Sequence, residues 1–182
     1  ELTIEERTAF GKRAACGDLI PMEDDDQADL YELTQAICDA HGLPAYEVSN
    51  HARSPAHQSR HNLTYWRGGD WIGLGPGAHG RLSVGGQRLA AHAAARPADY
   101  IASATSPLAS ETLTPLDTAR ELLALGLRPG EGIDPARIEA LTDEPLPADI
   151  LKSLVSGGLL QHGPDRIALT SEGRLLADRI VA

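Results

Sequence analysis

The sequence predicts an α/β segment over residues 1–95 and a small α+β domain over residues 96–182. In the first segment a helical pattern is followed by a short β-like run, and this happens twice, which is typical of an α/β layer with a parallel sheet. The composition changes near residues 96–110, and the pattern after that break is helix, helix, hairpin and helix. Because that order is winged-helix-like, we expect two parts with different architectures.

The first segment holds one clear helix and two candidate strands. Three aspartates at 24–26 precede a pattern that places Leu30, Leu33 and Ile37 on one face, and Gly42 follows it. Acidic residues favour a helix N-terminus, and glycine favours the position just after a helix. Two short β-like runs are expected to be strands, at residues 45–49 and at residues 71–74, the second one buried.

Turn and cap residues predict the remaining elements. Gly85-Gly86 suits a two-residue hairpin loop. Thr114 as N-cap, with Pro115 at the first helical position, begins a helix that runs towards Gly126. The other expected elements are one or two helical turns at 61–66, hairpin strands at 81–84 and 87–91, a short helix after Asp134-Pro135, a helix over 148–155, a hairpin from 160–162 and 167–169, and a final helix capped by Thr170.

The bulk composition disfavours several classes of protein. The chain of 182 residues carries 26 acidic and 16 basic side chains, a net charge of −10, which argues against nucleic acid as the main partner. No apolar run approaches the roughly 18 residues needed to span a bilayer, and no signal peptide is visible. Cys16 and Cys38 lack CxxC spacing, so we expect neither a disulfide framework nor a zinc ribbon, and a reducing, cytoplasmic setting fits. The chain starts at Glu1 and its only methionine is Met22, so we expect residues 2–4 to end a strand whose partners lie upstream.

A positively charged stretch lies within this acidic chain. Residues 51–92 hold five arginines and one acid, a local balance of +4, which leaves −14 for the rest. The arginines are Arg53, Arg60, Arg67, Arg81 and Arg88. Such a region attracts anionic ligands, and arginine pairs well with carboxylates. The alternative is that these are solubilising charges on loops.

Two motifs in this stretch have alternative interpretations. Residues 75–80 match G-x-G-x-x-G, but a hairpin is expected after them rather than the helix of a dinucleotide site, so a strand end close to some ligand is favoured. His57 and His61 have helical metal-ligand spacing, but Pro55 and the lack of a carboxylate disfavour zinc. One histidine suffices to bind haem iron, and a hydrogen-bonded loop histidine is the other interpretation of His61.

Aromatic residues follow His61 closely. Tyr65, Trp66 and Trp71 could form apolar walls for a porphyrin or simply pack in the core. No nucleophile stands beside a base in a recognisable pattern, so the sequence predicts no catalytic residue.

Three segments carry a family resemblance: residues 46–50, residues 59–66 with the pattern H-N-x-x-Y-W, and residues 73–79. They resemble the radical-SAM family of oxygen-independent coproporphyrinogen III oxidases and its haem chaperones of the HemW type. Segments near 121–133 and 158–173 are similar to the HemN-type C-terminal domain of that family. The resemblance covers essentially the whole chain, and it implies that residues 1–95 are the C-terminal segment of a radical-SAM (β/α) barrel.

The resemblance also implies a set of site residues. It makes His61 the candidate ligand of haem iron, with Tyr65 and Trp66 on the macrocycle and Arg60 or Arg67 near the propionates. It places Ile72, Gly73, Gly75 and Gly77 at the last barrel strand, beside S-adenosylmethionine. The [4Fe-4S] cluster motif CxxxCxxC is absent from this chain, so the cluster and S-adenosylmethionine are expected only in a longer parent protein.

Two departures from the family pattern stand near the site. His51 replaces the usual aromatic residue and is either a second haem contact or a neutral substitution. Pro76 replaces a small residue and removes one backbone N–H group.

Three functions follow as hypotheses. The first is a haem chaperone that passes haem to an acceptor protein, with the missing N-terminal half of the same chain as a further partner. The second is oxidative decarboxylation of coproporphyrinogen III by the full-length parent, which the H-N-x-x-Y-W element disfavours. The third treats residues 110–182 as an interaction module. These hypotheses name no particular acceptor, and they are compatible with association of the parent with a membrane.

Overall fold

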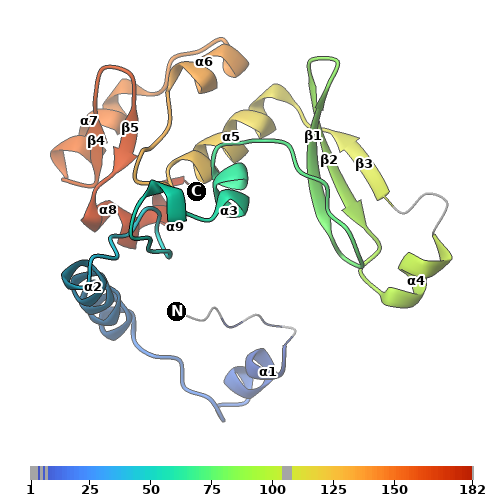
Figure 1. Ribbon diagram of the computed structural model, residues 1–182, viewed down its shortest axis with the longest axis horizontal. Helices are drawn as coiled ribbons and strands as arrows, with labels where there is room; N and C mark the ends of the chain where they lie inside the picture. Colours follow the sequence, from blue (N-terminus) through green and yellow to red (C-terminus); the bar gives the residue numbers. More distant parts are fainter. Residues whose placement is uncertain (1–3, 5, 7, 104–107, 182) are drawn as a thin grey trace.

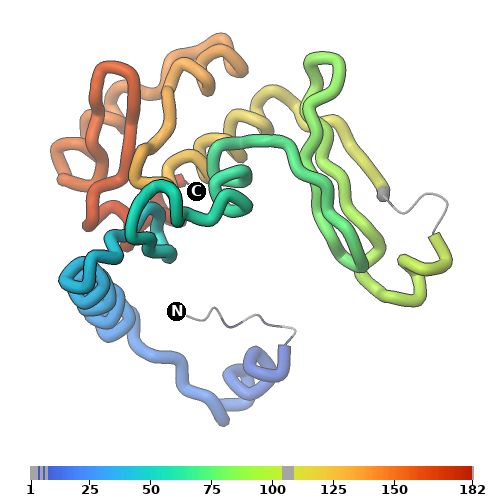
Figure 2. Tube along the Cα trace, viewed as in Figure 1, coloured from blue at the N-terminus to red at the C-terminus, as the bar shows by residue number. Residues whose placement is uncertain are grey.

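A computed structural model describes residues 4, 6, 8–103 and 108–181. The chain has mixed α/β structure arranged as an open arc (Figures 1 and 2). Its N-terminal helices are α1 (Ala9–Ala15) and α2 (Asp24–Ala40), and the next elements are the 3₁₀ turn η1 (Pro55–His57) and α3 (Arg60–Trp66). A three-stranded sheet follows with β1 (His79–Val84), β2 (Gln87–Ala93) and β3 (Leu108–Thr112), and α4 (Pro97–Ala102) lies between the last two strands. The C-terminal elements are α5 (Pro115–Gly126), α6 (Ala136–Thr142), α7 (Ala148–Ser156), β4 (Leu160–His162), β5 (Ile167–Leu169), α8 (Ser171–Leu175) and α9 (Ala177–Val181).

The predicted helix at α2 is confirmed. Its first turn holds the three aspartates, and Gly42 follows it with a positive φ of 70°. The predicted apolar face exists, but Leu30, Leu33 and Ile37 are each about half exposed, at 50%, 54% and 51%. No residue of α2 is buried by the described part of the chain. The expected strand end at Leu2 and Thr3 lies outside the described residues.

The described residues do not by themselves form the predicted parallel sheet, and all three of their strand pairings are antiparallel. The run 45–49 makes only isolated antiparallel bridges, from Ala45 to His51 and from Glu47 to Pro129. The run 71–74 makes one such bridge, from Trp71 to Arg81, and it is not buried, because Ile72 is 63% and Leu74 is 86% exposed. Among the described residues, neither run has a neighbouring segment that stays alongside it long enough to form a ladder.

The predicted hairpin is confirmed and extends into a sheet. Gly85 and Gly86 have φ values of 58° and 80°, which suits a two-residue turn between twisted strands. The third strand, β3, pairs antiparallel with β2 from Leu89 opposite Thr112 to Ala93 opposite Leu108. Sequence reasoning missed β3, which lies in the stretch of changed composition. The division of the chain at residues 95 and 96 stays a prediction.

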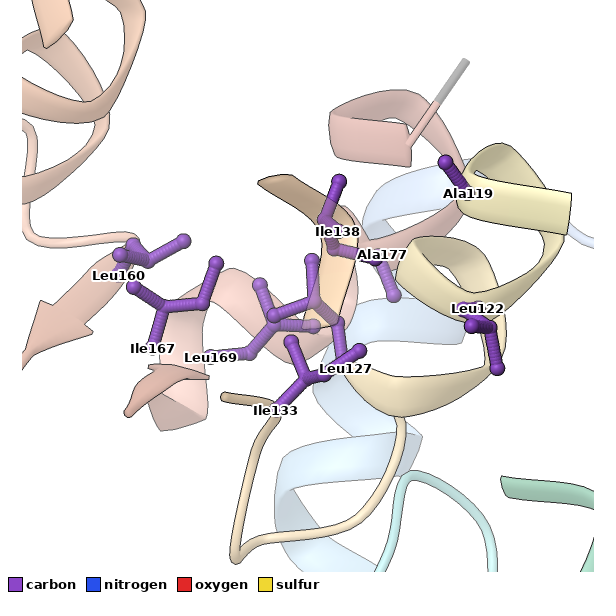
Figure 3. Close-up of a cluster of buried hydrophobic side chains, with 9 residues drawn as sticks. All are labelled: Ala119, Leu122, Leu127, Ile133, Ile138, Leu160, Ile167, Leu169 and Ala177. Atoms are coloured by element: carbon purple, nitrogen blue, oxygen red, sulfur yellow. The ribbon is translucent and has the colours of Figure 1, made fainter. Parts of the chain in front are cut away.

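The C-terminal elements enclose the main core. Thr114 caps α5 as predicted, because its Oγ1 accepts a hydrogen bond of 3.1 Å from the backbone N–H of Asp117. The hairpin β4–β5 is confirmed, and Ile167 on it is only 1% exposed. The predicted final helix is instead two short helices, α8 and α9, which meet at Leu176. Figure 3 shows the buried side chains of this core: Ala119, Leu122, Leu127, Ile133, Ile138, Leu160, Ile167, Leu169 and Ala177.

Among the described residues, every helix is too short or too polar to cross a lipid bilayer.

Substitution of Gly173 tests how closely the C-terminal core is packed. A Cβ at Gly173 would overlap the carbonyl oxygen of Leu159, whereas a Cβ at Gly163 would meet Arg166 O at an ordinary 3.5 Å. We expect Gly173→Ala to lower the free energy of unfolding by about 1–3 kcal/mol, the usual cost of overpacking. Gly163→Ala should change it by less than about 0.5 kcal/mol. Urea denaturation of both variants measures this, and equal stabilities would contradict the packing described.

Candidate functional site

Helix α3 carries the central candidate residue and is fixed at its start. The Ser59 Oγ accepts a hydrogen bond of 3.3 Å from the backbone N–H of Asn62, which makes Ser59 the N-cap. The backbone N–H of Ser59 donates to the Tyr46 hydroxyl at 3.2 Å. Leu63 is the buried residue of the helix, so α3 presents its other side to solvent.

The exposed side of α3 holds a row of three rings. His61 and Tyr65 are four residues apart and therefore share one helix face. The Tyr65 hydroxyl and the His61 Nε2 lie 2.6 Å apart in a hydrogen bond, and the two rings meet edge to face with centroids 4.5 Å apart. The ring of Trp71 continues the row at 4.6 Å from Tyr65, again edge to face. The imidazole of His61 is exposed at the end of this row.

Trp66 lies away from this row. Five positions after His61, it emerges from a different face of α3. The guanidinium of Arg128 lies over its ring at 4.9 Å from the centroid, and its Nε1 is buried with no hydrogen-bond partner among the described residues. The structure therefore brings Tyr65 and His61 together with Trp71, and places Trp66 against the C-terminal elements.

Three of the five arginines in the basic stretch are neutralised by carboxylates. Arg67 makes two hydrogen bonds to Glu131, at 2.8 and 2.9 Å, and Arg81 lies 2.7 Å from Glu121. Arg88 pairs with Asp70 at 2.6 Å. The two remaining arginines, Arg53 and Arg60, are exposed and make no ion pair within the described part of the chain. Arg60 is the first residue of α3, so an unpaired positive charge lies at the start of the helix that carries the exposed imidazole.

The glycine-rich segment makes a tight backbone crossing at Gly73. A Cβ at Gly73 would overlap the carbonyl oxygen of His79, so a side chain cannot be accommodated there. Gly75 has a φ of 107°, and its N–H donates to the Tyr100 hydroxyl at 3.3 Å. Gly77 N–H donates to Ala94 O at 2.9 Å. The close contact with His79 explains why position 73 is glycine. The backbone N–H groups of Gly75 and Gly77 are already hydrogen-bonded within the protein.

The other histidines of the motif region lie elsewhere. His57 is in η1, before α3 begins, and bonds to the Ser54 hydroxyl at 2.9 Å, so it does not share a helix face with His61. His51 bonds through Nε2 to Gln35 Oε1 at 2.9 Å. It lines a cleft of about 730 Å³ beside α2, together with Met22 and Tyr31. Sequence reasoning missed this cleft, because no motif links Met22 and Tyr31 to His51. Among the described residues, no group of three or more His, Cys, Asp or Glu side chains could hold a metal ion.

The chain has relatives among characterised families. Residues 113–176 match the family model described as the HemN C-terminal domain. The chain is 41% identical over 183 residues to a protein named Heme chaperone HemW from Mycobacterium tuberculosis (strain CDC 1551 / Oshkosh), an alignment covering 99% of this chain and 45% of that protein. It is 31% identical over 210 residues to the mitochondrial Radical S-adenosyl methionine domain-containing protein 1 of Dictyostelium discoideum, covering 99% of this chain and 47% of the relative.

A solved structure also matches. Its title reads "Coproporphyrinogen III oxidase (HemN) from Escherichia coli is a Radical SAM enzyme", with a TM-score of 0.46, 21% identity, and coverage of 81% of this chain and 32% of that one. This chain thus spans less than half the length of these relatives.

The Arg67–Glu131 pair predicts a pH dependence of stability. The hydrogen bonds and charge of Arg67 hold the pKa of Glu131 below its ordinary value of 4.5. A carboxyl whose pKa is lowered on folding stabilises the fold above its unfolded pKa, and this contribution is lost as the pH falls through the folded value. Because the pair is solvated, the contribution is below about 1 kcal/mol. We expect denaturation midpoints of Glu131→Gln to fall less than those of the parent between about pH 6 and about pH 3. A parallel fall in both proteins would contradict the pairing.

Proposed function

Because the chain belongs to the HemW/HemN-like family, we propose that it is the haem-binding part of a haem chaperone, with the His61 imidazole as the ligand of the iron. The name of the mycobacterial relative supports this function over decarboxylation of coproporphyrinogen III. The observation that carries the proposal is the exposed imidazole of His61 at the end of the ring row. Haem is the cargo of such a protein, and the acceptor that receives it is a further partner of the proposed function.

The ring row suits a porphyrin in shape and chemistry. A porphyrin offers a wide apolar face, and the Tyr65 ring presents aromatic surface next to the imidazole. Trp71 extends this surface, with the guanidinium groups of Arg81 and Arg88 over its ring at 5.8 and 5.7 Å from the centroid. Histidine nitrogen is a common ligand of haem iron. We propose that Nε2 is the ligand atom, with the Tyr65 hydroxyl giving up its hydrogen bond when iron binds. The Arg60 guanidinium, which has no carboxylate partner among the described residues, would pair with a propionate.

Two of the predicted haem contacts, Arg67 and Trp66, are engaged by other residues. Arg67 can reach a propionate only after leaving Glu131, and Trp66 would contact the macrocycle only after leaving Arg128. Arg60 and Tyr65 therefore form the core of the proposed haem site with His61.

The second part of the proposal concerns the domains and cofactors of a longer parent protein. We propose that residues 1–95 complete a radical-SAM barrel there and that residues 96–182 are its HemN-type C-terminal domain with winged-helix-like order. The uncovered apolar face of α2 and the exposed Ile72 support this, because a barrel would cover such surfaces. Ile72 and the glycines at 73, 75 and 77 would then lie near S-adenosylmethionine, and the [4Fe-4S] cluster would be held by cysteines outside this chain.

Loss of the imidazole tests the haem site. We expect haem titrated into the chain to give a Soret band whose affinity falls by about tenfold or more in His61→Ala, because the bond to iron is lost. His57→Ala is the matched control, since His57 is also exposed and nearby but lies off α3. Unchanged haem spectra and affinity in His61→Ala would overturn the assignment.

Removal of the Tyr65 hydroxyl tests which nitrogen binds iron. If Nε2 is the ligand, Tyr65→Phe removes a competing hydrogen bond worth about 1 kcal/mol, so the affinity for haem should rise about fivefold. The ring itself remains, so the aromatic surface is unchanged. Absorption titration with haem measures this, and an unchanged affinity would point to Nδ1 instead.

A further inference from the structure

Two histidines face one another across the β1–β2 hairpin, away from α3. The strand register places His79 directly opposite His92, and their ring centroids are 6.4 Å apart with the planes 33° from parallel. Both side chains are exposed. Neither imidazole makes a hydrogen bond or ion pair with any described residue, so no existing bond has to be broken for these nitrogens to bind a ligand.

We propose that His79 and His92 together bind a divalent transition-metal ion of the zinc, nickel or copper type. Neutral imidazole is a preferred ligand for these ions, and zinc binds histidine nitrogen at about 2.0–2.1 Å. Residues directly opposite in an antiparallel pair have Cβ atoms about 4.5–5.5 Å apart, so rotation about the side-chain bonds can direct two nitrogens onto one ion. Two linked imidazoles hold an ion better than one, because the second binds at high effective concentration.

The backbone beneath the pair is held on several sides. Beyond the pair, Ala93 N–H donates to Ala78 O at 2.8 Å, and Gly77 N–H donates to Ala94 O at 2.9 Å. On the outer side, β3 continues the sheet next to β2. These bonds prevent the strands from separating at this end, so the two imidazoles stay opposite one another without a ligand. A preorganised pair loses little entropy when it binds an ion.

The residues beside the pair leave the space above the rings open. The bridge between Trp71 and Arg81 sets a register that puts Gly73 beside His79, and β3 puts Ala109 opposite His92. Neither neighbour has a side chain long enough to cover an imidazole. Arg81, the next residue on this face of β1, would repel a cation, but Glu121 neutralises it at 2.7 Å.

The site would be open rather than closed. No third histidine, cysteine or carboxylate of the described residues completes a metal-binding cluster here. Two protein ligands leave the remaining coordination positions to water or to another donor, unlike a structural zinc site with four protein ligands. The bound ion should therefore exchange readily and accept a further ligand.

Titration of the 182-residue chain, without an affinity tag, with Zn²⁺ and with Ni²⁺ tests this inference. Calorimetry should show one site whose affinity falls about tenfold or more in His79→Asn and in His92→Asn alike. His162→Asn is the matched control, since His162 is also exposed and on a hairpin strand, and it should bind as the parent does. Circular dichroism of each variant verifies that the sheet is retained, and His79→Gln and His92→Gln repeat the test if either asparagine variant misfolds.

The outcomes separate this inference from the proposed function. Loss of metal binding in the His79 and His92 variants, with haem binding kept, supports it. Metal binding unaffected by either substitution, or affected by only one, overturns it. His61→Ala should weaken haem binding about tenfold or more without changing metal binding, so failure of one site leaves the other standing.

Discussion

The attachment of α3 to the C-terminal elements is the constraint on which the candidate site depends. It is made at the end of the helix, by residues 66–68. The Trp66 ring lies under the Arg128 guanidinium, and Gly68 packs so closely on α5 that a Cβ there would overlap Leu122. A positive φ of 66° at Gly68 turns the chain away at this point. The tryptophan of the H-N-x-x-Y-W motif thus anchors the helix, while its histidine stays in solvent.

This attachment explains why so short a helix can present a site. Seven residues are too few for a helix to be stable alone in water, so the position of α3 must come from its contacts. The buried Leu63 and the Arg67–Glu131 pair add to the anchor from the same side. The side chains of His61 and Tyr65 are therefore positioned by anchoring contacts that other side chains of this segment make. A change in the core around α5 should disturb the site as much as a change beside it.

Local signals in the sequence predicted much of this fold. Thr114 and Thr170 cap helices as expected, and Gly85-Gly86 forms its hairpin, because caps and tight turns depend on neighbouring residues. The strands expected at 45–49 and 71–74 form only isolated bridges among the described residues. A strand needs a partner segment, and local composition does not identify that partner. The row of rings from His61 to Trp71 was predictable only in part. Helical spacing places Tyr65 beside His61, but the position of Trp71 depends on its bridge to Arg81, which the sequence does not reveal. Likewise, the ion pair that neutralises Arg67 spans 64 residues of sequence.

In the proposed haem site, the hydrogen bond between Tyr65 and His61 bears on the release of haem as well as on its binding. A haem chaperone of the proposed kind must release its haem, and release leaves the ligand nitrogen without its bond to iron. Here the phenol stands 2.6 Å away and can reclaim the nitrogen as the iron departs. In the proposed function, the returning hydrogen bond would offset part of the free-energy cost of breaking the bond between His61 and iron, so this pair of side chains would favour reversible binding of haem.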